Sequence, residues 1–124
     1  MGNIIYKEES YKIVGACMEV HSNLGIGFKE AVYKDALEVE FERLTIPFIR
    51  EKQFRIEYKG IILSHKYFAD FILFDSIVLE VKSAAVIVDR FVAQTINYLK
   101  ASGIRLGIIG NFGEKSFTCK RVVF

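Results

Sequence analysis

The chain has 124 residues, of which 52% are hydrophobic and 26% are charged. These proportions are typical of globular proteins and exclude a disordered or fibrous chain, and the length suits one ordinary domain. The formal net charge is only +2, so any phosphate binding must come from a local patch rather than from an overall positive field. No segment approaches the roughly 20 consecutive apolar residues that span a bilayer. We therefore expect one cytoplasmic domain, residues 1–124, that has no membrane partner.

Apolar residues recur at helical spacing in three segments, which span about residues 6–24, 28–44 and 86–102. Glycines follow the first and third segments and tolerate the positive φ values that end helices. Pro47 follows the second segment, and proline disfavours the helical conformation in the residue before it. The sequence therefore predicts three helices.

Runs rich in β-branched and aromatic residues lie between and after these helices. Residues 48–58 alternate with the period of a strand that has one wet face, and a short run follows at 61–63. Residues 67–74 and 77–82 are almost continuously apolar, as in central strands that are covered on both faces. Two more strands are predicted at 104–111 and 116–124. The expected order is ααββββαββ, an α/β fold in which α-helices flank a central mixed β-sheet.

Three charged residues interrupt the apolar strands. Glu80 and Lys82 are two residues apart in one predicted strand and so project from the same face, while Asp70 lies in the preceding strand. Buried charges are costly unless they are paired or bind a metal ion. Carboxylates are the hard oxygen ligands that hold Mg²⁺, and a lysine can orient a water or neutralise charge at phosphorus. The set suits the metal-assisted hydrolysis of a phosphodiester.

This interpretation makes a demand on the hairpin between the two strands. If Asp75 and Ser76 formed a two-residue loop, Asp70 would fall opposite Val81 and on the face away from Glu80. A longer loop or a β-bulge would restore a shared face, and Asp-Ser without glycine is a poor type I′ turn. The alternative is that Glu80 and Lys82 simply mark the wet end of a strand and pair with each other or with solvent.

Residues far apart in the chain agree with one known family. The segment Gly27-Phe28-Lys29-Glu30-Ala31-Val32-Tyr33 resembles the signature of the GxxExxY proteins, a group within the PD-(D/E)XK nuclease-like superfamily. The match continues, between about residues 13 and 122, at Glu19-Val20-His21, Ala69-Asp70, Leu79-Glu80-Val81-Lys82, Ala93-Gln94, Asn97-Tyr98-Leu99, Leu106-Gly107 and Asn111-Phe112-Gly113. The resemblance implies a restriction-endonuclease-like core.

The resemblance also implies a role for each site residue. Asp70 and Glu80 look like the metal ligands, with Mg²⁺ or Mn²⁺ as the ion, and Lys82 looks like the catalytic lysine. Glu30 resembles the helical acid that assists the metal site, and Gln94 resembles the superfamily's helical glutamine. Two positions depart from the pattern: Phe68 replaces a basic residue, and Phe91 replaces a histidine.

Aromatic side chains near these motifs have a simpler interpretation as well. Tyr33 and Tyr98 could line a cleft, but aromatic residues at helical spacing more often belong to a core. A lone histidine such as His21 more often packs or caps carbonyls than contacts phosphate. Cys17 and Cys119 stand in no metal-binding spacing, and we expect both to be reduced packing residues.

We therefore carry forward two main hypotheses. The first is a Mg²⁺-dependent phosphodiesterase that acts on DNA or RNA, and the second is a catalytically inactive nuclease-fold module that binds nucleic acid or a protein partner. A weaker third hypothesis is a structural homodimer whose exposed aromatic residues serve only association. A salt bridge of Lys82 that seals the site would favour the module. Because so small a domain has little room for a recognition element, we expect specificity to come from a homodimer or a partner.

Overall fold

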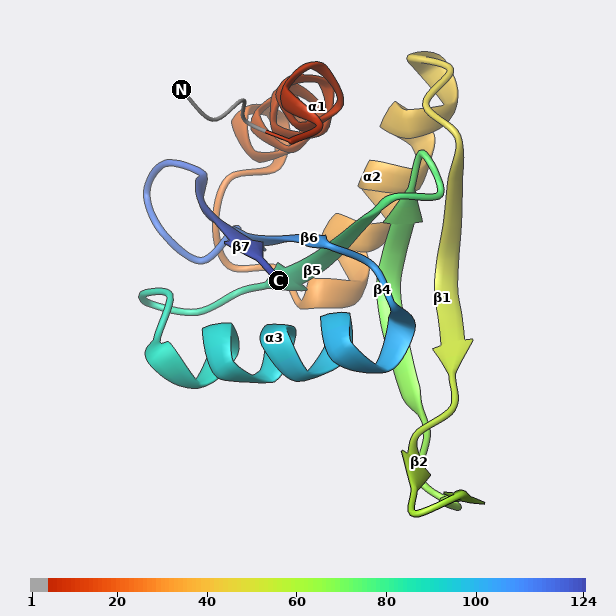
Figure 1. Ribbon diagram of the computed structural model, residues 1–124. Coiled ribbons are helices and arrows are strands. Elements are labelled where there is room, and N and C mark those ends of the chain that lie inside the picture. Colours follow the sequence, from red (N-terminus) through yellow and green to blue (C-terminus); the bar gives the residue numbers. More distant parts are fainter. Residues whose placement is uncertain (1–4) are drawn as a thin grey trace, which may run out of the picture.

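The computed structural model describes residues 5–124, which form three helices and seven strands (Figure 1). Their order is α1 (Lys7–Leu24), α2 (Glu30–Arg43), β1 (Phe48–Phe54), β2 (Glu57–Tyr58), β3 (Ile61–Ile62), β4 (Tyr67–Leu73), β5 (Ile77–Lys82), α3 (Asp89–Ser102), β6 (Leu106–Asn111) and β7 (Thr118–Val123). Five strands form one sheet in the order β1-β4-β5-β6-β7, in which only β5 and β6 run parallel. The predicted α/β fold with a mixed sheet is confirmed.

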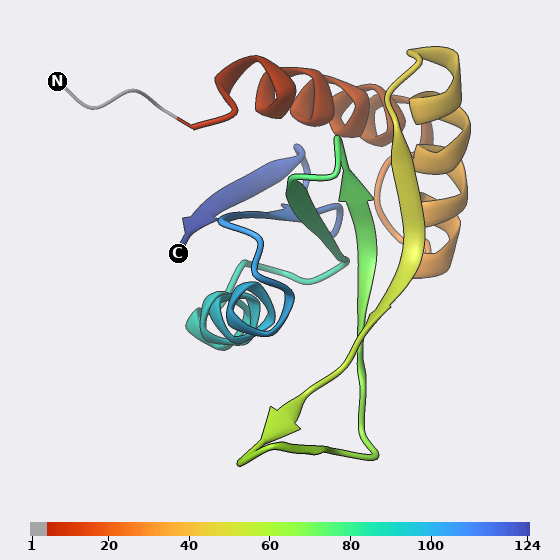
Figure 2. The ribbon, with the colours of Figure 1, turned by 45° about the vertical axis from the view of Figure 1, so that its right-hand side comes forward.

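The predicted strand over residues 48–58 is wrong as a single element. β1 ends at Phe54, and after two residues the chain begins β2, which pairs with β3 instead of β4. Residues 55–66, which we call the arm, therefore leave the main sheet as a separate hairpin that projects from the body of the protein (Figure 2). Periodicity could not reveal this break, because both parts of the segment are extended.

The helices end where glycine and proline predicted. Gly25 and Gly103 adopt φ values of 70° and 75°, and their backbone N–H groups donate hydrogen bonds to carbonyl groups of the last helical turns. α3 starts three residues later than predicted. The backbone N–H of Ala84 donates to Oδ1 of Asn111 at 2.9 Å, and Nδ2 of Asn111 donates to the Ala84 carbonyl at 2.9 Å. These bonds hold the loop before α3 in a non-helical shape.

The sheet separates two hydrophobic clusters. α1 and α2 cover one face, where Leu37 and Phe41 of α2 pack with Phe71 of β4 and Leu79 of β5. α3 covers the other face with a smaller cluster that includes Leu99 (Figures 1 and 2). The central strand β5 is buried on both sides, as its apolar sequence predicted. A charged residue within β5 is therefore removed from water.

Two further sequence predictions concern single features. No helix within residues 5–124 is long and apolar enough to cross a membrane. Cys17 is buried in the core as expected, but Cys119 is exposed, so the prediction that it packs is wrong. Cys119 lies on β7, which is an edge strand of the sheet and pairs only with β6.

The loop after β6 approaches the loop after β5 so closely that only glycine fits at position 113. A Cβ at Gly113 would lie 2.4 Å from both the backbone N and the carbonyl O of Ala84. We expect Gly113→Ala to lower the free energy of unfolding by about 1–3 kcal/mol, because backbone must shift to relieve the overlap. Urea unfolding measures this. Gly15→Ala in α1 is the control, since a Cβ added there would have open space around it, and equal stabilities of the two variants would contradict the prediction.

Candidate active site

The hairpin between β4 and β5 has the register that the acidic site requires. Leu73 pairs with Ile77, so the loop contains the three residues 74–76, two of which adopt left-handed φ values of 54° and 55°. The antiparallel pairing continues to Phe71 opposite Leu79. Asp70 and Glu80 are the next residues along the two strands, just beyond the last regular pair. The prediction that the loop exceeds two residues is confirmed.

β4 changes its pattern of burial at Asp70. The side chains of Tyr67 and Ala69 pack in the cluster beneath α3, whereas Phe71, again an odd-numbered position, packs in the cluster beneath α1 and α2. Strict alternation along a strand would keep these three on one face. Glu51 of β1, which stands opposite Asp70 in the register, has a φ of 56°, a conformation that costs energy for a residue other than glycine. The irregular backbone therefore coincides with the acidic residues.

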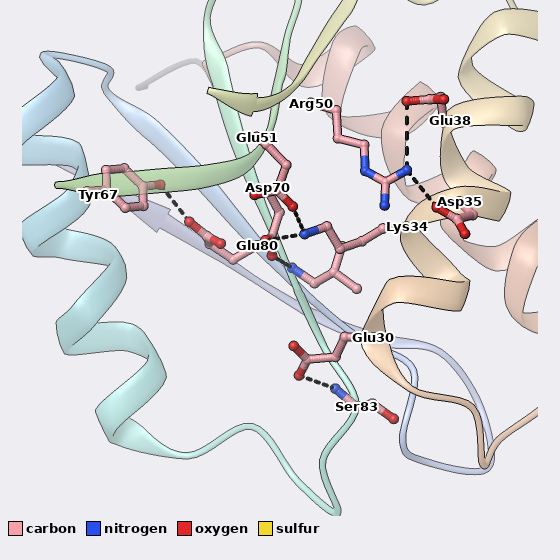
Figure 3. A network of polar contacts seen from close by, with 11 residues as sticks. Glu30, Lys34, Asp35, Glu38, Arg50, Glu51, Tyr67, Asp70, Glu80 and Ser83 are labelled. Carbon is pink, nitrogen blue, oxygen red and sulfur yellow. Dashed lines mark hydrogen bonds and ion pairs between the residues drawn. The ribbon is translucent and has the colours of Figure 1, made fainter. Parts of the chain in front are cut away.

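The carboxylate of Asp70 is fixed from two sides (Figure 3). Its Oδ2 accepts a hydrogen bond from the backbone N–H of Val81 at 2.7 Å, which ties β4 to β5 where their regular pairing ends. Its Oδ1 lies 3.0 Å from Nζ of Lys34, on α2, and the same ammonium group also contacts the carboxylate of Glu51. The Lys34 side chain is only 13% exposed, so this ion pair is largely shielded from solvent.

Lys34 remains a cation in this position. Burial acts to lower the pKa of its ammonium group, but the hydrogen bonds and negative charges of Glu51 and Asp70 outweigh burial and raise the pKa above its ordinary value. A permanently charged lysine thus balances one of the two strand carboxylates. Glu80 has no such partner, because none of the ion pairs among residues 5–124 involves it.

Glu80 is the buried acid of the site, with 5% of its surface exposed. Its Oε1 accepts a hydrogen bond of 2.5 Å from the hydroxyl of Tyr67. Burial, followed by the negative charge of Asp70, raises the pKa of Glu80 to about 8, although Tyr67 and Lys82 oppose the shift. In the absence of an added cation, the carboxyl group therefore holds its proton at neutral pH.

Tyr67 belongs to an aromatic stack that closes one side of the acidic site. Its ring lies 3.6 Å from that of Tyr98 on α3, centroid to centroid, at an angle of 10°, and 5.6 Å from that of Phe54. Burial and the charge of Glu80 raise the pKa of the Tyr67 hydroxyl, so this group stays protonated and donates to Glu80. Of the two tyrosines considered from the sequence, Tyr98 lies here, whereas Tyr33 is fully buried.

Lys82 lies two residues beyond Glu80 on the same strand, at the end of β5. Its Nζ is 4.7 Å from the ring centroid of Phe91, a cation–π contact. Phe91 is the position at which the family resemblance led us to expect a histidine. No ion pair within the described part of the chain involves Lys82, so its ammonium group is held by an aromatic face rather than by a carboxylate.

The other two predicted residues lie at the margins of this arrangement. Glu30 begins α2, and its Oε2 accepts a hydrogen bond from the backbone N–H of Ser83 at 3.2 Å, just past the end of β5 (Figure 3). Gln94 is exposed on α3, one helical turn before Tyr98. The structure therefore brings Asp70 and Glu80 together and leaves the carboxylate of Glu30 on a different partner.

Sequence analysis missed Lys34, Tyr67 and Glu51. Lys34 had a usable signal, because it follows Glu30 by four residues and residues at this spacing share one face of a helix. Tyr67 and Glu51 had none, since an aromatic residue in an apolar strand and an acid on a wet strand are both ordinary. His21 packs, as the simpler interpretation held: it is buried, stacks on Phe112 and contacts the Glu114 carbonyl through Nε2 at 2.8 Å.

Asp70 and Glu80 are the two carboxylates that would hold a divalent cation. Among residues 5–124, no group of three or more histidine, cysteine, aspartate or glutamate side chains converges as a complete metal cage. Mg²⁺ usually keeps several waters and needs only one or two carboxylates. A cation beside Asp70 and Glu80 would also favour the ionised form of Glu80, which forms no ion pair among residues 5–124.

Comparison with known proteins identifies a family. The family model of the PD-(D/E)XK nuclease superfamily matches residues 7–122, which is almost the whole chain. No curated protein and no solved structure gives a significant match. The superfamily part of the sequence resemblance is confirmed, while membership of the GxxExxY group stays a prediction.

The raised pKa of Glu80 makes stability depend on pH. The folded chain holds the Glu80 proton up to a pH of about 8, whereas the ordinary pKa is 4.5. The stability from this proton is therefore fully present below pH 4.5 and is lost as the pH rises through about 8. Urea unfolding at several pH values with a chelator should show this loss in the wild type. Glu80→Gln keeps an acceptor for Tyr67 but cannot ionise, so parallel curves for the two proteins would contradict the prediction.

Removal of the Lys34 ammonium group should destabilise the fold. We expect Lys34→Met to lower the free energy of unfolding by about 1–3 kcal/mol, because Asp70 then keeps only its hydrogen bond from the backbone of Val81. Arg50→Met is the matched control. Its partners Asp35 and Glu38 have side chains that are 72% and 41% exposed, so that loss should stay below about 1 kcal/mol.

The double variant Lys34→Met/Asp70→Asn separates the ion pair from packing. It should recover part of the stability that Lys34→Met loses, because the largely buried carboxylate of Asp70, which would lack its cation, is gone. Chemical denaturation of the four proteins of this cycle gives the coupling energy. Strictly additive losses would show that the two side chains do not interact.

Proposed function

The chain belongs to the PD-(D/E)XK nuclease superfamily, and we propose that it is a metal-dependent phosphodiesterase that cleaves nucleic acid. The proposed ion is Mg²⁺ or Mn²⁺, and residues 1–124 are proposed to form a single nuclease-like domain. The observation that carries this proposal is the pair of acids, Asp70 and Glu80, which lie on adjacent strands just beyond their last regular pair, with Glu80 buried. A protein gains no stability from a desolvated acid beside a second one. A cation bound between the two acids would offset this unfavourable arrangement.

In this proposal Asp70 and Glu80 hold the ion. When bound, the ion would stabilise negative charge on a phosphoryl group and lower the pKa of an attacking water. Lys34 pairs with Asp70 and fixes the direction of its Oδ1. The Tyr67 hydroxyl fixes one oxygen of Glu80. Both ligands are thus preorganised by neighbours on other elements.

Lys82 supplies the positive charge of the proposed active site. It projects from the same strand as Glu80, so a phosphodiester beside the carboxylate pair would also lie beside its ammonium group. There Lys82 would orient the attacking water or neutralise the charge that develops at phosphorus. The contact with the face of Phe91 holds the ammonium group without a carboxylate competitor. Glu30, held by Ser83 at the end of β5, would assist from the edge of the site.

The second candidate function is an inactive module that uses this fold to bind nucleic acid or a protein. Two observations favour it: the Glu30 carboxylate binds the backbone at Ser83 instead of joining the strand acids, and the raised pKa of Glu80 disfavours the ionised form that binds a metal ion. Titration with Mn²⁺ tests whether Glu80 can still bind a metal ion despite its raised pKa. In the first function, Mn²⁺ raises the melting temperature of the wild type and has no such effect on Glu80→Gln.

Cleavage of labelled DNA and RNA, single-stranded and double-stranded, tests the proposed chemistry. We expect cutting only with added Mg²⁺ or Mn²⁺, and losses of at least about a hundredfold in Glu80→Gln and Lys82→Met, since each removes a ligand or a charge that stabilises the transition state. Lys120→Met, an exposed lysine on β7, is the control and should cut like the wild type.

Two other results would contradict the phosphodiesterase. Equal cutting by wild type and both site variants would reveal a contaminating nuclease. Folded wild type that neither cuts any of the four substrates nor gains stability from Mn²⁺ would support the inactive module.

A further inference from the structure

A groove of about 890 Å³ lies between the arm and α3, outside the acidic site. The arm forms one wall, with Arg55 and Ile62, and α3 forms the other, with Asn97, Tyr98 and Lys100. Figure 2 shows the arm extending beyond the sheet on the side of α3. Because the arm exists only where the chain leaves the main sheet at Phe54, this groove is a product of the break between β1 and β2.

The groove and the acidic site share one side chain, that of Tyr67. Tyr67 lines the inner end of the groove, and its hydroxyl donates the hydrogen bond to Glu80. Gln94, which stood apart from the carboxylates, lines the same groove. The negative charge of Glu80, after burial, also raises the pKa of Tyr98, which places that ring within the electrostatic reach of the site. A molecule in the groove would therefore lie next to the acidic site, with the Tyr67 ring between it and Glu80.

The lining combines the three chemistries that bind a nucleic acid strand. Arg55 and Lys100 place a positive charge on each wall, while Glu57 is the single acid among the lining residues of the described chain. Ile62 and Tyr98 offer apolar and aromatic surface, and Asn97 offers an amide. Cations that follow the phosphates, together with aromatic side chains on which bases stack, are the features of single-strand binding grooves.

We propose that this groove binds an unpaired segment of DNA or RNA and guides the strand to Asp70 and Glu80, an inference that rests on the proposed phosphodiesterase. The volume supports an unpaired strand, because it lies within the roughly 300–1,000 Å³ of pockets that enclose a molecule of drug size. A short run of nucleotides fits such a space, and a duplex does not.

The charges favour an unpaired strand over a duplex as well. Binding to duplex backbone depends almost wholly on phosphate contacts by lysine and arginine. The groove offers two cations, and the chain as a whole has a net charge of only +2. Stacking of bases adds affinity that only an unpaired strand can obtain. The enzyme would accordingly prefer single-stranded or frayed substrates.

Binding without metal tests this inference apart from cleavage. Fluorescence anisotropy in the presence of a chelator would compare labelled single-stranded DNA and RNA with duplexes of the same length. We expect the single strands to bind at least about tenfold more tightly. In Arg55→Ala/Lys100→Ala the affinity should fall about tenfold, and the slope of log affinity against log salt should fall by about 1.4 for two phosphate contacts.

Arg43→Ala/Lys120→Ala is the matched control, since both residues are exposed and neither lines the groove. This variant should bind within about twofold of the wild type. Oligonucleotides with 5-iodouracil, irradiated and mapped by mass spectrometry, would locate the strand independently of affinity. Crosslinks should fall on Tyr98 or on peptides of the arm.

Each result has a defined meaning. Three results would contradict the proposed strand binding in the groove. They are an equal loss of affinity in the two double variants, tighter binding of duplex than of single strands, and crosslinks confined to other surfaces. If single strands bind as described but are not cleaved with any metal ion, the result would support strand binding in the groove and contradict the proposed phosphodiesterase activity. If metal-dependent cleavage is unchanged in Arg55→Ala/Lys100→Ala, the result would support the phosphodiesterase activity and contradict the proposal that the groove binds the substrate strand.

Discussion

The carboxyl group of Glu80, buried in the central strand of the sheet, is the constraint on which the rest of the site depends. Helices cover both faces of β5, so this acid lies in a region of low polarity, where its charged form is disfavoured. The Tyr67 hydroxyl donates a hydrogen bond to it, and the negative charge of Asp70 acts on it from β4. Helix packing that stabilises the fold thus produces an acid that a divalent cation would complete.

The second carboxylate is accommodated by a distortion of the backbone. β4 switches its buried side at Asp70, and Glu51 on the neighbouring strand adopts a left-handed conformation. The contacts of Asp70 with the Val81 backbone and with Lys34 compensate for the regular pairing that is lost there. Strained backbone tends to persist at functional sites because surrounding contacts hold it. β1 and β4 stay paired from there to Phe54 and Tyr67, and the chain between these two residues leaves the main sheet as the arm.

Much of the fold could be predicted because the residue patterns that indicate its helices and strands lie within short segments of the sequence. The helix ends follow from glycine φ values, and the buried character of β5 follows from its apolar run. The pairing of Asp70 with Glu80 could be stated as a condition on loop length, which the three-residue loop at 74–76 meets. The arm and Lys34 could not be predicted with equal force. An extended segment does not reveal its partner strand, and a lysine on a helix does not reveal which acid it meets.

The sequence by itself determined the elements, their order and the acids that could bind a cation, because periodicity and residue chemistry are properties of short segments. Only the tertiary structure decided how those acids are used. It placed Asp70 beside Lys34, desolvated Glu80 against Tyr67, turned Glu30 toward Ser83 and opened a groove between the arm and α3. Each of these results depends on the distance between residues remote in the chain. Burial and charge pairing are set by packing of whole elements, and no local pattern records them.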